Sequence, residues 1–416
     1  MIEAAGYRLR TGTASTAVEP VSEGVNRIAR RGVSMKRTMV FLICSVALSF
    51  PGVVGAASEP GAARPEPLFP VHQRDKCGYI DRAGKVVIEP RFNYGRRFSD
   101  GFAAVQMKKE AGDKWVWGFI DRTGAFVIAP RFEEAGDFSE GLAMVKDGQC
   151  GFVNPAGVVV IPPRFSRAES FSEGLAAVEI GDGNEKRWGY VDQGGNLVIA
   201  AQFQEAASFH QGLAAVKQGG KYGYINKTGA FVIPPTYAGA RDFSEGLAFV
   251  IMEGADDPPK AAYLDRSGKT VVELRAYEAG DFREGLAPVN VKFEFGVGKD
   301  NLPIVRGSWG YIDTTGKRVI DFQYAEAHAF HDGLAAVNVG SVFQAKWGFI
   351  DRTGKMVIKP QFSSIGDFAD GLAEVYVGSR TKSQRAGAAD FAVMIDLGVP
   401  GYVDATGKVI WKPQSR

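Results

Sequence analysis

The 416-residue sequence contains few of the residues that cross-link a chain or bind a metal. Three cysteines and four histidines are too few for a disulfide-rich scaffold or a dense Cys/His zinc site. A formal net charge of +2 gives little attraction for nucleic acid. Glycine, by contrast, occurs 52 times and phenylalanine 28 times, a composition typical of short strands joined by tight turns.

Motifs for catalysis are also missing. The chain has no Gly-x-Ser-x-Gly elbow, phosphate-binding loop, dinucleotide fingerprint or His-Glu-x-x-His pair. We therefore assign no catalytic, cofactor-binding or metal-binding residues and expect a protein that is not an enzyme and needs no cofactor.

The amino-terminal region predicts export. A basic start at Met35 precedes an apolar run over residues 40–50, and small residues follow it, so residues 35–56 are expected to be a cleavable secretory signal. The apolar run is shorter than the roughly 20 residues of a transmembrane helix. Residues 1–34 are interpreted as an upstream extension wrongly included before the true start. The alternative is an uncleaved amino-terminal segment that anchors the protein.

Cleavage would leave a periplasmic or secreted protein with no membrane insertion. Residues 57–76 contain four prolines and few apolar residues, and are expected to form an extended linker.

The remainder, residues 77–413, is a tandem repeat. A Gly-aromatic-aliphatic-Asp/Asn block opens each unit. A Phe-x-x-Gly block follows, and its glycine lies 23 residues after the opening position in all eight full units. The distance from that second glycine to the next opening varies from 10 to 30 residues. All length variation therefore falls in one connection per unit. The opening positions are Gly78, Gly118, Gly151, Gly189, Gly223, Ala262, Gly310, Gly348 and, in a terminal half unit, Gly401.

The local sequence predicts strands. Gly78-Tyr79-Ile80-Asp81 and the following Val-Val-Ile run fit a tight hairpin in which Asp81 caps its own turn. With the Leu-Ala-x-Val segment, each unit is expected to hold three strands.

The arrangement of the units has two alternatives. In a closed propeller, the two chain ends usually supply complementary strands of one blade. Here both ends carry the same half of a unit, which favours an all-β, open, curved array of stacked three-stranded hairpin repeats. A β-propeller is the alternative.

The repeated phrases resemble the bacterial WG-repeat (KWG-repeat) family over nearly all of residues 77–413. This resemblance implies a β-repeat architecture and an interaction role, and it brings no catalytic residue. The Trp-Gly pairs that carry it begin at Trp117, Trp188, Trp309 and Trp347.

Several repeated positions are candidates for sites. The recurrent acidic residue before the second glycine is expected to stabilise its own turn; the alternative is a row of carboxylates that binds cations or pairs with basic residues of neighbouring units. His328 and His331 have a spacing of three but are expected in a solvent-facing loop, without a metal. Cys77 and Cys150 occupy the same position in different units and are expected to remain unpaired. The repeated aromatic residues are expected to pack as core.

Features that do not repeat are better candidates for function, because binding residues concentrate on loops held by a rigid scaffold. Two long insertions, residues 290–307 and 376–399, qualify. The candidate partner-binding residues in them are Phe293, Phe295, Lys299, Arg306, Arg380, Lys382, Arg385 and Phe391.

The sequence therefore predicts an exported, non-enzymatic repeat protein that presents an extended surface to an unidentified protein or glycan of the cell envelope. The alternative is an envelope hydrolase or lyase on a propeller-like scaffold.

Overall fold

The computed structural model describes residues 65–108, 114–297, 303–340, 345–378, 380–386, 390–396 and 399–413. In these residues nearly every element is a β-strand, and the one helix is a short 3-10 turn, Gly183–Glu185. No helix among them is long and apolar enough to span a membrane.

The strands form nine successive antiparallel sheets, here called blades 1 to 9. Blade 1 has three strands, β1 (Phe69–Gln73), β2 (Lys76–Ile80) and β3 (Val86–Phe92). Blade 2 contains β4 (Tyr94–Gly95), β5 (Ala103–Lys108), β6 (Trp115–Ile120) and β7 (Phe126–Phe132). Blade 3 contains β8 (Glu134–Ser139), β9 (Leu142–Asp147), β10 (Gln149–Val153) and β11 (Val159–Phe165). Blade 4 contains β12 (Arg167–Ala168), β13 (Leu175–Ile180), β14 (Arg187–Asp192) and β15 (Leu197–Phe203).

The later blades repeat this plan. Blade 5 contains β16 (Glu205–Ala206), β17 (Leu213–Gln218), β18 (Lys221–Asn226) and β19 (Phe231–Tyr237), and blade 6 contains β20 (Gly239–Ala240), β21 (Leu247–Ile251), β22 (Lys260–Asp265) and β23 (Thr270–Arg275). Blade 7 contains β24 (Glu278–Ala279), β25 (Leu286–Val297), β26 (Pro303–Asp313) and β27 (Arg318–Tyr324), and blade 8 contains β28 (Glu326–Ala327), β29 (Leu334–Asn338), β30 (Trp347–Asp351) and β31 (Met356–Phe362). Blade 9 contains β32 (Ser364–Ile365), β33 (Leu372–Val377), β36 (Val399–Asp404) and β37 (Val409–Trp411), and the separate ribbon of β34 (Arg380–Ala386) and β35 (Asp390–Asp396) is inserted in it.

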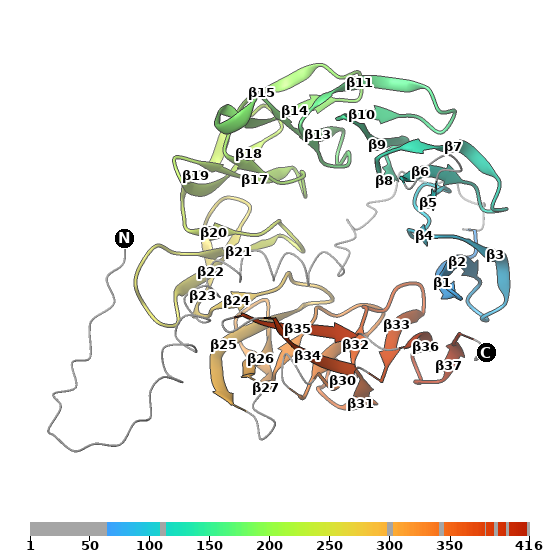
Figure 1. Cartoon of the computed structure of the whole chain (residues 1–416). Coiled ribbons are helices and arrows are strands. Elements are labelled where there is room, and N and C mark those ends of the chain that lie inside the picture. The colour runs from blue at the N-terminus through green and yellow to red at the C-terminus, as the bar shows by residue number, and fades with distance from the viewer. Residues whose placement is uncertain are drawn as a thin grey trace, which may run out of the picture. The chain divides into compact units, whose positions relative to one another are not determined.

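The blades follow one another around a ring, with β3, β7 and β11 toward the rim and the short first strands, such as β4, toward the middle (Figure 1). The fold is a nine-bladed β-propeller, which was the alternative, and the expected open array is wrong. The expected three strands per unit are also corrected, because blades 2 to 9 each have four. The extra strand is only two residues long in most blades, and the region expected as a linker supplies β1.

The glycine that opens each unit allows a close approach between two strands. A Cβ atom at Gly78 would lie 2.4 Å from the carbonyl oxygen of Ile88 on β3, where the pairing register shifts in a β-bulge. Blade 6 provides the comparison, because Ala262 replaces this glycine. There β22 pairs with β23 without the first of the two register shifts that other blades show, and β23 is one residue shorter than the equivalent strands.

Aromatic side chains join each blade to the next, as expected for core residues. An aromatic ring of the third strand in one blade packs on the phenylalanine of the following Phe-x-x-Gly block, as in Tyr79 with Phe98, whose ring centroids are 5.0 Å apart. Where the first ring is tyrosine, its hydroxyl also donates to a carbonyl oxygen of the next blade, as Tyr79 does to Arg96 at 2.8 Å. These rings are among the largest fully buried side chains.

The ring closes through side chains. Tyr402 of blade 9 packs edge-on against Phe69 of blade 1, with centroids 5.6 Å apart, and its hydroxyl donates to the carbonyl oxygen of Pro70 at 2.9 Å. Phe69, Val71, Ile80, Leu372 and Tyr402 share one buried cluster. Among the described strands, none is exchanged between blades 1 and 9, so blade 1 and blade 9 are each built from their own segment of chain.

We expect Tyr402→Phe to lower the free energy of unfolding by about 1 kcal/mol, because the Pro70 carbonyl loses its donor at the closure. Tyr324→Phe is the matched control, since the buried Tyr324 hydroxyl makes no hydrogen bond within the described residues. Denaturant unfolding of both variants is the measurement. Equal losses in the two variants would contradict the role assigned to Tyr402.

Candidate interaction surfaces

The propeller has one uniform and one variable face. Strands alternate in direction within each blade, so every connection between the second and third strands emerges on the same side of the ring. This side, the variable face, contains all the length variation. The turns between first and second strands and between third and fourth strands lie on the opposite side, the fixed face.

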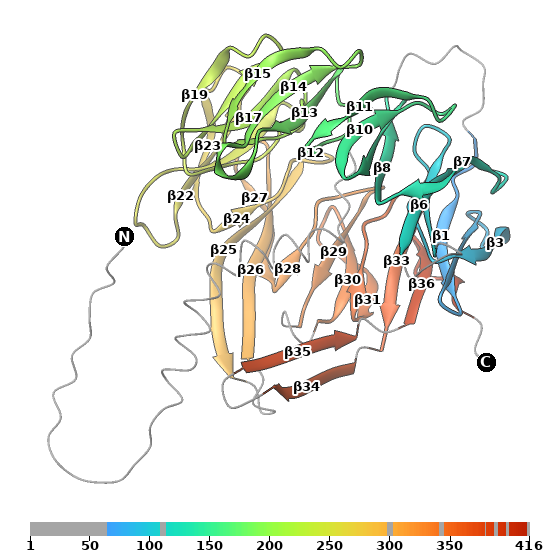
Figure 2. The ribbon, with the colours of Figure 1, turned by 45° about the horizontal axis from the view of Figure 1, so that its top comes forward.

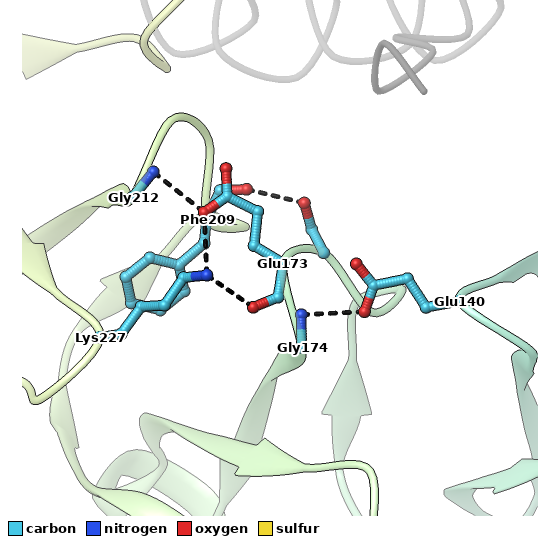
Figure 3. A network of polar contacts seen from close by, with 7 residues as sticks. Glu140, Glu173, Gly174, Phe209, Gly212 and Lys227 are labelled. Carbon is cyan, nitrogen blue, oxygen red and sulfur yellow. Dashed lines mark hydrogen bonds and ion pairs between the residues drawn. The ribbon is translucent and has the colours of Figure 1, made fainter. Parts of the chain in front are cut away.

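Turns of the fixed face are held by acidic side chains. Asp81 caps its own turn as expected, because its Oδ1 accepts from the backbone N–H groups of Ala83 and Lys85, both at 2.9 Å. The acidic residue before the second glycine acts differently. Its side chain reaches the next blade and accepts a hydrogen bond from the N–H of the equivalent glycine there, as Glu140 does from Gly174 at 2.9 Å (Figure 3).

This carboxylate ladder links blades 2 to 9 in order. Seven hydrogen bonds of 2.9–3.1 Å make it up, with a glutamine in one position. The acceptors are Asp100, Glu140, Glu173, Gln211, Glu245, Glu284 and Asp332.

The same residues adopt a strained backbone. Their φ angles lie between 49° and 54°, in the left-handed region, where glutamate is uncommon. The following glycine also has a positive φ, so the pair forms a type I′-like hairpin turn. The hydrogen bond to the next blade offsets this strain.

The ladder explains why carboxylates recur. Its main partner is a backbone N–H, not the cation or basic side chain considered from the sequence. Lys227 adds a basic contact in one place, 3.2 Å from Glu173 (Figure 3). Asp370 has the same backbone geometry, with φ of 56°, but Pro67 occupies the equivalent position in blade 1 and has no N–H to donate.

We expect Glu173→Ala to lower the free energy of unfolding by about 1–2 kcal/mol, because the Gly212 N–H loses its acceptor. Asp370→Ala changes the same turn position without removing a hydrogen bond among the described residues, so we expect little change. Denaturant titration compares the two. A similar loss in both variants would show that the turn residue matters only for its own backbone.

The candidate residues of the first insertion lie on an extended hairpin of the variable face. Phe293 and Phe295 are on β25 and Arg306 is on β26, whereas Lys299 lies outside the described residues. The half-buried Phe293 ring packs on Tyr277, with centroids 5.1 Å apart. At the base of the hairpin, the buried Asn290 accepts from the N–H of Ser308 at 2.9 Å.

Candidate residues of the second insertion lie on the β34–β35 ribbon (Figure 2). Arg380, Lys382 and Arg385 are on β34, and Phe391 pairs with Arg385 from β35. The two insertions are thus separate hairpins on different blades, β25–β26 on blade 7 and β34–β35 on blade 9.

The cysteines and histidines are placed as follows. Cys77 and Cys150 are buried and unpaired, as expected. Cys44 lies outside the described residues. The position of His331, expected to face solvent, is half-buried, with 27% of the His331 side chain exposed. Where this position is serine, the hydroxyl donates to the next blade, as Ser99 does to the Phe138 carbonyl at 2.7 Å. His331 Nε2 instead lies 3.8 Å from Asp367.

A set of charged side chains that sequence reasoning missed lies at the inner ends of the blades. These side chains pair from one blade to the next: Arg96 with Asp137 at 3.7 Å, and His328 with Asp367 at 2.7 Å. We call them the inner belt. The signal in the sequence was the variation of the residues next to each repeated phenylalanine: six of the nine ion-paired members lie one or two positions before it, two directly follow it, and one lies four positions before it. Its ion-paired members are Arg96, Asp137, His210, Arg241, Asp242, Glu278, His328, His331 and Asp367.

The inner belt holds titratable groups in unlike surroundings. Burial raises the pKa of Asp242 to about 6, although His210 acts against it. Burial lowers the pKa of His328, but Asp367 outweighs this effect and the net change is upward. Burial also opposes ionisation of Asp367, yet His328 holds the pKa of that carboxyl below its ordinary value. Within the described chain, no three His, Cys, Asp or Glu side chains are grouped to hold a metal.

The raised pKa of Asp242 predicts a pH dependence of stability. Between about pH 4 and 6 the folded protein keeps a proton that the unfolded chain has released, so this carboxyl makes stability fall as pH rises through that range. We expect Asp242→Asn to remove that decline. Denaturant unfolding of wild type and variant from pH 4 to 7 measures it, and an unchanged decline in the variant would contradict the assignment.

Comparisons with known proteins agree with this architecture. A family model described as the WG containing repeat matches eight segments, residues 78–115, 117–149, 151–183, 188–222, 222–254, 262–292, 309–342 and 347–380. Among curated proteins, none matches the sequence.

Solved structures show the fold alone. A crystal structure of the eukaryotic initiation factor is 11% identical, with a TM-score of 0.55, and the alignment covers 84% of this chain and 96% of that one. Kluyveromyces lactis Hsv2p is 9% identical with a TM-score of 0.37, over 64% of this chain and 96% of that one.

Proposed function

Since the chain belongs to the WG-repeat family and its repeats form a propeller, we propose that it is an exported, non-enzymatic binding protein of the cell envelope. In this proposal the ring is a rigid scaffold, and the variable face contacts a protein or glycan partner. The protein would be periplasmic or secreted after cleavage of residues 35–56, with no membrane insertion and no nucleic-acid partner.

The observation that carries the proposal is the confinement of length variation to one face. The fixed face repeats the same turns and ladder bonds in every blade from 2 to 9, whereas the variable face ranges from a tight turn at Gly148 to the long hairpins of blades 7 and 9. Insertions on one face of a repeat array commonly form its binding surface. The buried Asn290 supports the base of one hairpin from within its blade.

The rival function, a hydrolase or lyase, draws on the unlike carboxylates of the inner belt. Glycoside hydrolysis uses two carboxylates that flank one bond. Asp242 and Asp367 belong to blades 6 and 9, and each is paired with a histidine of the preceding blade. This arrangement favours ion pairs that support the ring over a catalytic pair.

The long hairpins can each be replaced by a tight turn like that of blade 3. Gly378 has a φ of 78°, close to the 72° of Gly148, which forms the tight turn of blade 3. Deleting residues 379–398 therefore joins Val377, Gly378 and Val399 in the geometry of that turn. Replacing residues 291–308 with Asp-Gly-Gln does the same in blade 7.

We expect each change to reduce co-sedimentation of the purified protein with the envelope fraction of its native host, and the double change to abolish it. The control replaces residues 180–187 of blade 4 with the same Asp-Gly-Gln turn, which shortens an ordinary connection. Retained binding by the double variant, with an unchanged melting temperature, would contradict the proposal. The mass of the protein recovered from the host tests export, because cleavage after Ala56 or Ala57 is expected.

A further inference from the structure

Among the residues that the structure describes, blade 1 has no inner strand, whereas every other blade has one. In blade 2 this strand lies along β5, where the Arg96 N–H donates to the Ala104 carbonyl at 2.9 Å. Pro70 on β1 is equivalent to Ala104, since each pairs with the aromatic residue of the neighbouring third strand. In blade 1 the Tyr402 hydroxyl takes the place of the missing N–H, so β1 remains the inner edge of its sheet.

Side chains from four blades, 1, 2, 3 and 9, form a group near this edge. His72 of blade 1 contacts Tyr94 of blade 2, with ring centroids 5.9 Å apart, and Tyr94 contacts Trp117 at 5.7 Å. The Arg96 guanidinium lies over the Trp117 ring, 5.5 Å from its centroid. From the other side, Arg97 extends over the Phe69 ring, 5.6 Å from its centroid, into the seam between blades 9 and 1.

Blade 9 adds a carboxylate and a phenol. The Tyr376 hydroxyl donates to Glu374 at 3.0 Å. Burial raises the pKa of Tyr94, and the charges of Arg96 and Glu374 act on this phenol in opposite directions. The group formed by His72, Tyr94, Arg96, Arg97, Trp117, Asp137, Glu374 and Tyr376 is here called the seam cluster.

The seam cluster is accessible. Tyr94 is 44% exposed, more than any other described tyrosine. The other aromatic members of the cluster, His72, Trp117 and Tyr376, are half-buried. Aromatic rings that keep one face open supply stacking area at low entropic cost.

Two polar atoms in the seam cluster lack partners. Arg96 Nε and Asp137 Oδ1 are buried, and neither has a hydrogen bond within the described residues. The closest approach of this ion pair, Nη1 to Oδ2, is 3.7 Å, longer than a hydrogen bond. A buried donor beside a buried acceptor is satisfied by a ligand group that both donates and accepts, which is what a hydroxyl does.

The charges of the seam cluster balance. Two guanidinium groups, Arg96 and Arg97, accompany two carboxyl groups, Asp137 and Glu374. Burial lowers the pKa of His72, so this ring is neutral at pH 7. A site with balanced charge gives no preference for an anionic or a cationic ligand.

Backbone pairing with a peptide is disfavoured at the same edge. Pro67 and Pro70 remove two N–H groups from this segment, and proline on an edge strand blocks the addition of a further strand. A ligand held by side chains fits this edge better than an extended peptide does.

We propose that the seam cluster binds a neutral saccharide, with a sugar ring stacked on Tyr94 and hydroxyl groups bonded to Arg96, Asp137 and Glu374. This inference rests on the proposed binding role of the protein but assigns it a second group of residues, of which only Tyr376 belongs to the insertions named above.

The test is isothermal titration calorimetry of the purified protein with maltotetraose, cellotetraose and chitotetraose as neutral probes. We expect at least one of them to bind, Tyr94→Ala to weaken that binding by about tenfold or more, and Glu374→Gln to weaken it as well. Phe126→Ala is the matched control, because Phe126 is similarly exposed, at 41%, on the outer strand β7. Circular dichroism melts confirm that the variants fold.

Absence of binding by all three neutral probes would overturn the proposal, as would equal affinities of the Tyr94→Ala and Phe126→Ala variants. Binding of only an acidic oligosaccharide, such as tetragalacturonate, or of only an unstructured peptide would overturn it too. The hairpin variants distinguish the two proposals: they should bind the saccharide normally, whereas Tyr94→Ala should still co-sediment with envelopes.

Discussion

The packing of an aromatic ring in one blade on a phenylalanine in the next is the contact on which the rest of the molecule depends. A single blade cannot bury both faces of its sheet, so each needs a following blade in a fixed register. The number of residues between the ring and that phenylalanine is therefore constant, and the turn between them repeats. Length varies only in the connections of the variable face, which this contact does not constrain.

Much of the fold follows from the sequence because these contacts repeat. The all-β class, the turn-capping role of Asp81, the buried aromatic rings and the unpaired Cys77 and Cys150 are confirmed. The short first strands were missed because two residues are too few to show alternation. Pro67 and Pro70 conceal β1 in the sequence, since several prolines with few apolar residues are typical of a linker. Closure was missed because it uses the side chains of Tyr402 and Phe69 in place of a shared strand.

The candidate sites also differ in how far the sequence reveals them. Insertions are visible in a sequence as changes in spacing, so the hairpins of blades 7 and 9 could be named in advance. The inner belt and the seam cluster could not, because their members lie in different repeats and meet only when the blades pack against one another. His72 and Tyr376, for example, are separated by nearly the whole propeller in the sequence, although their blades, 1 and 9, are neighbours in the ring.

The way the ring closes also has a mechanical consequence. Blades 1 and 9 each come from one continuous stretch of chain, and the joint between them consists of side-chain contacts without backbone pairing. The first and last strands of the domain lie on either side of that joint. A load applied between the two ends of the domain would act across the seam directly, whereas it would reach the other eight joints only after the seam had parted.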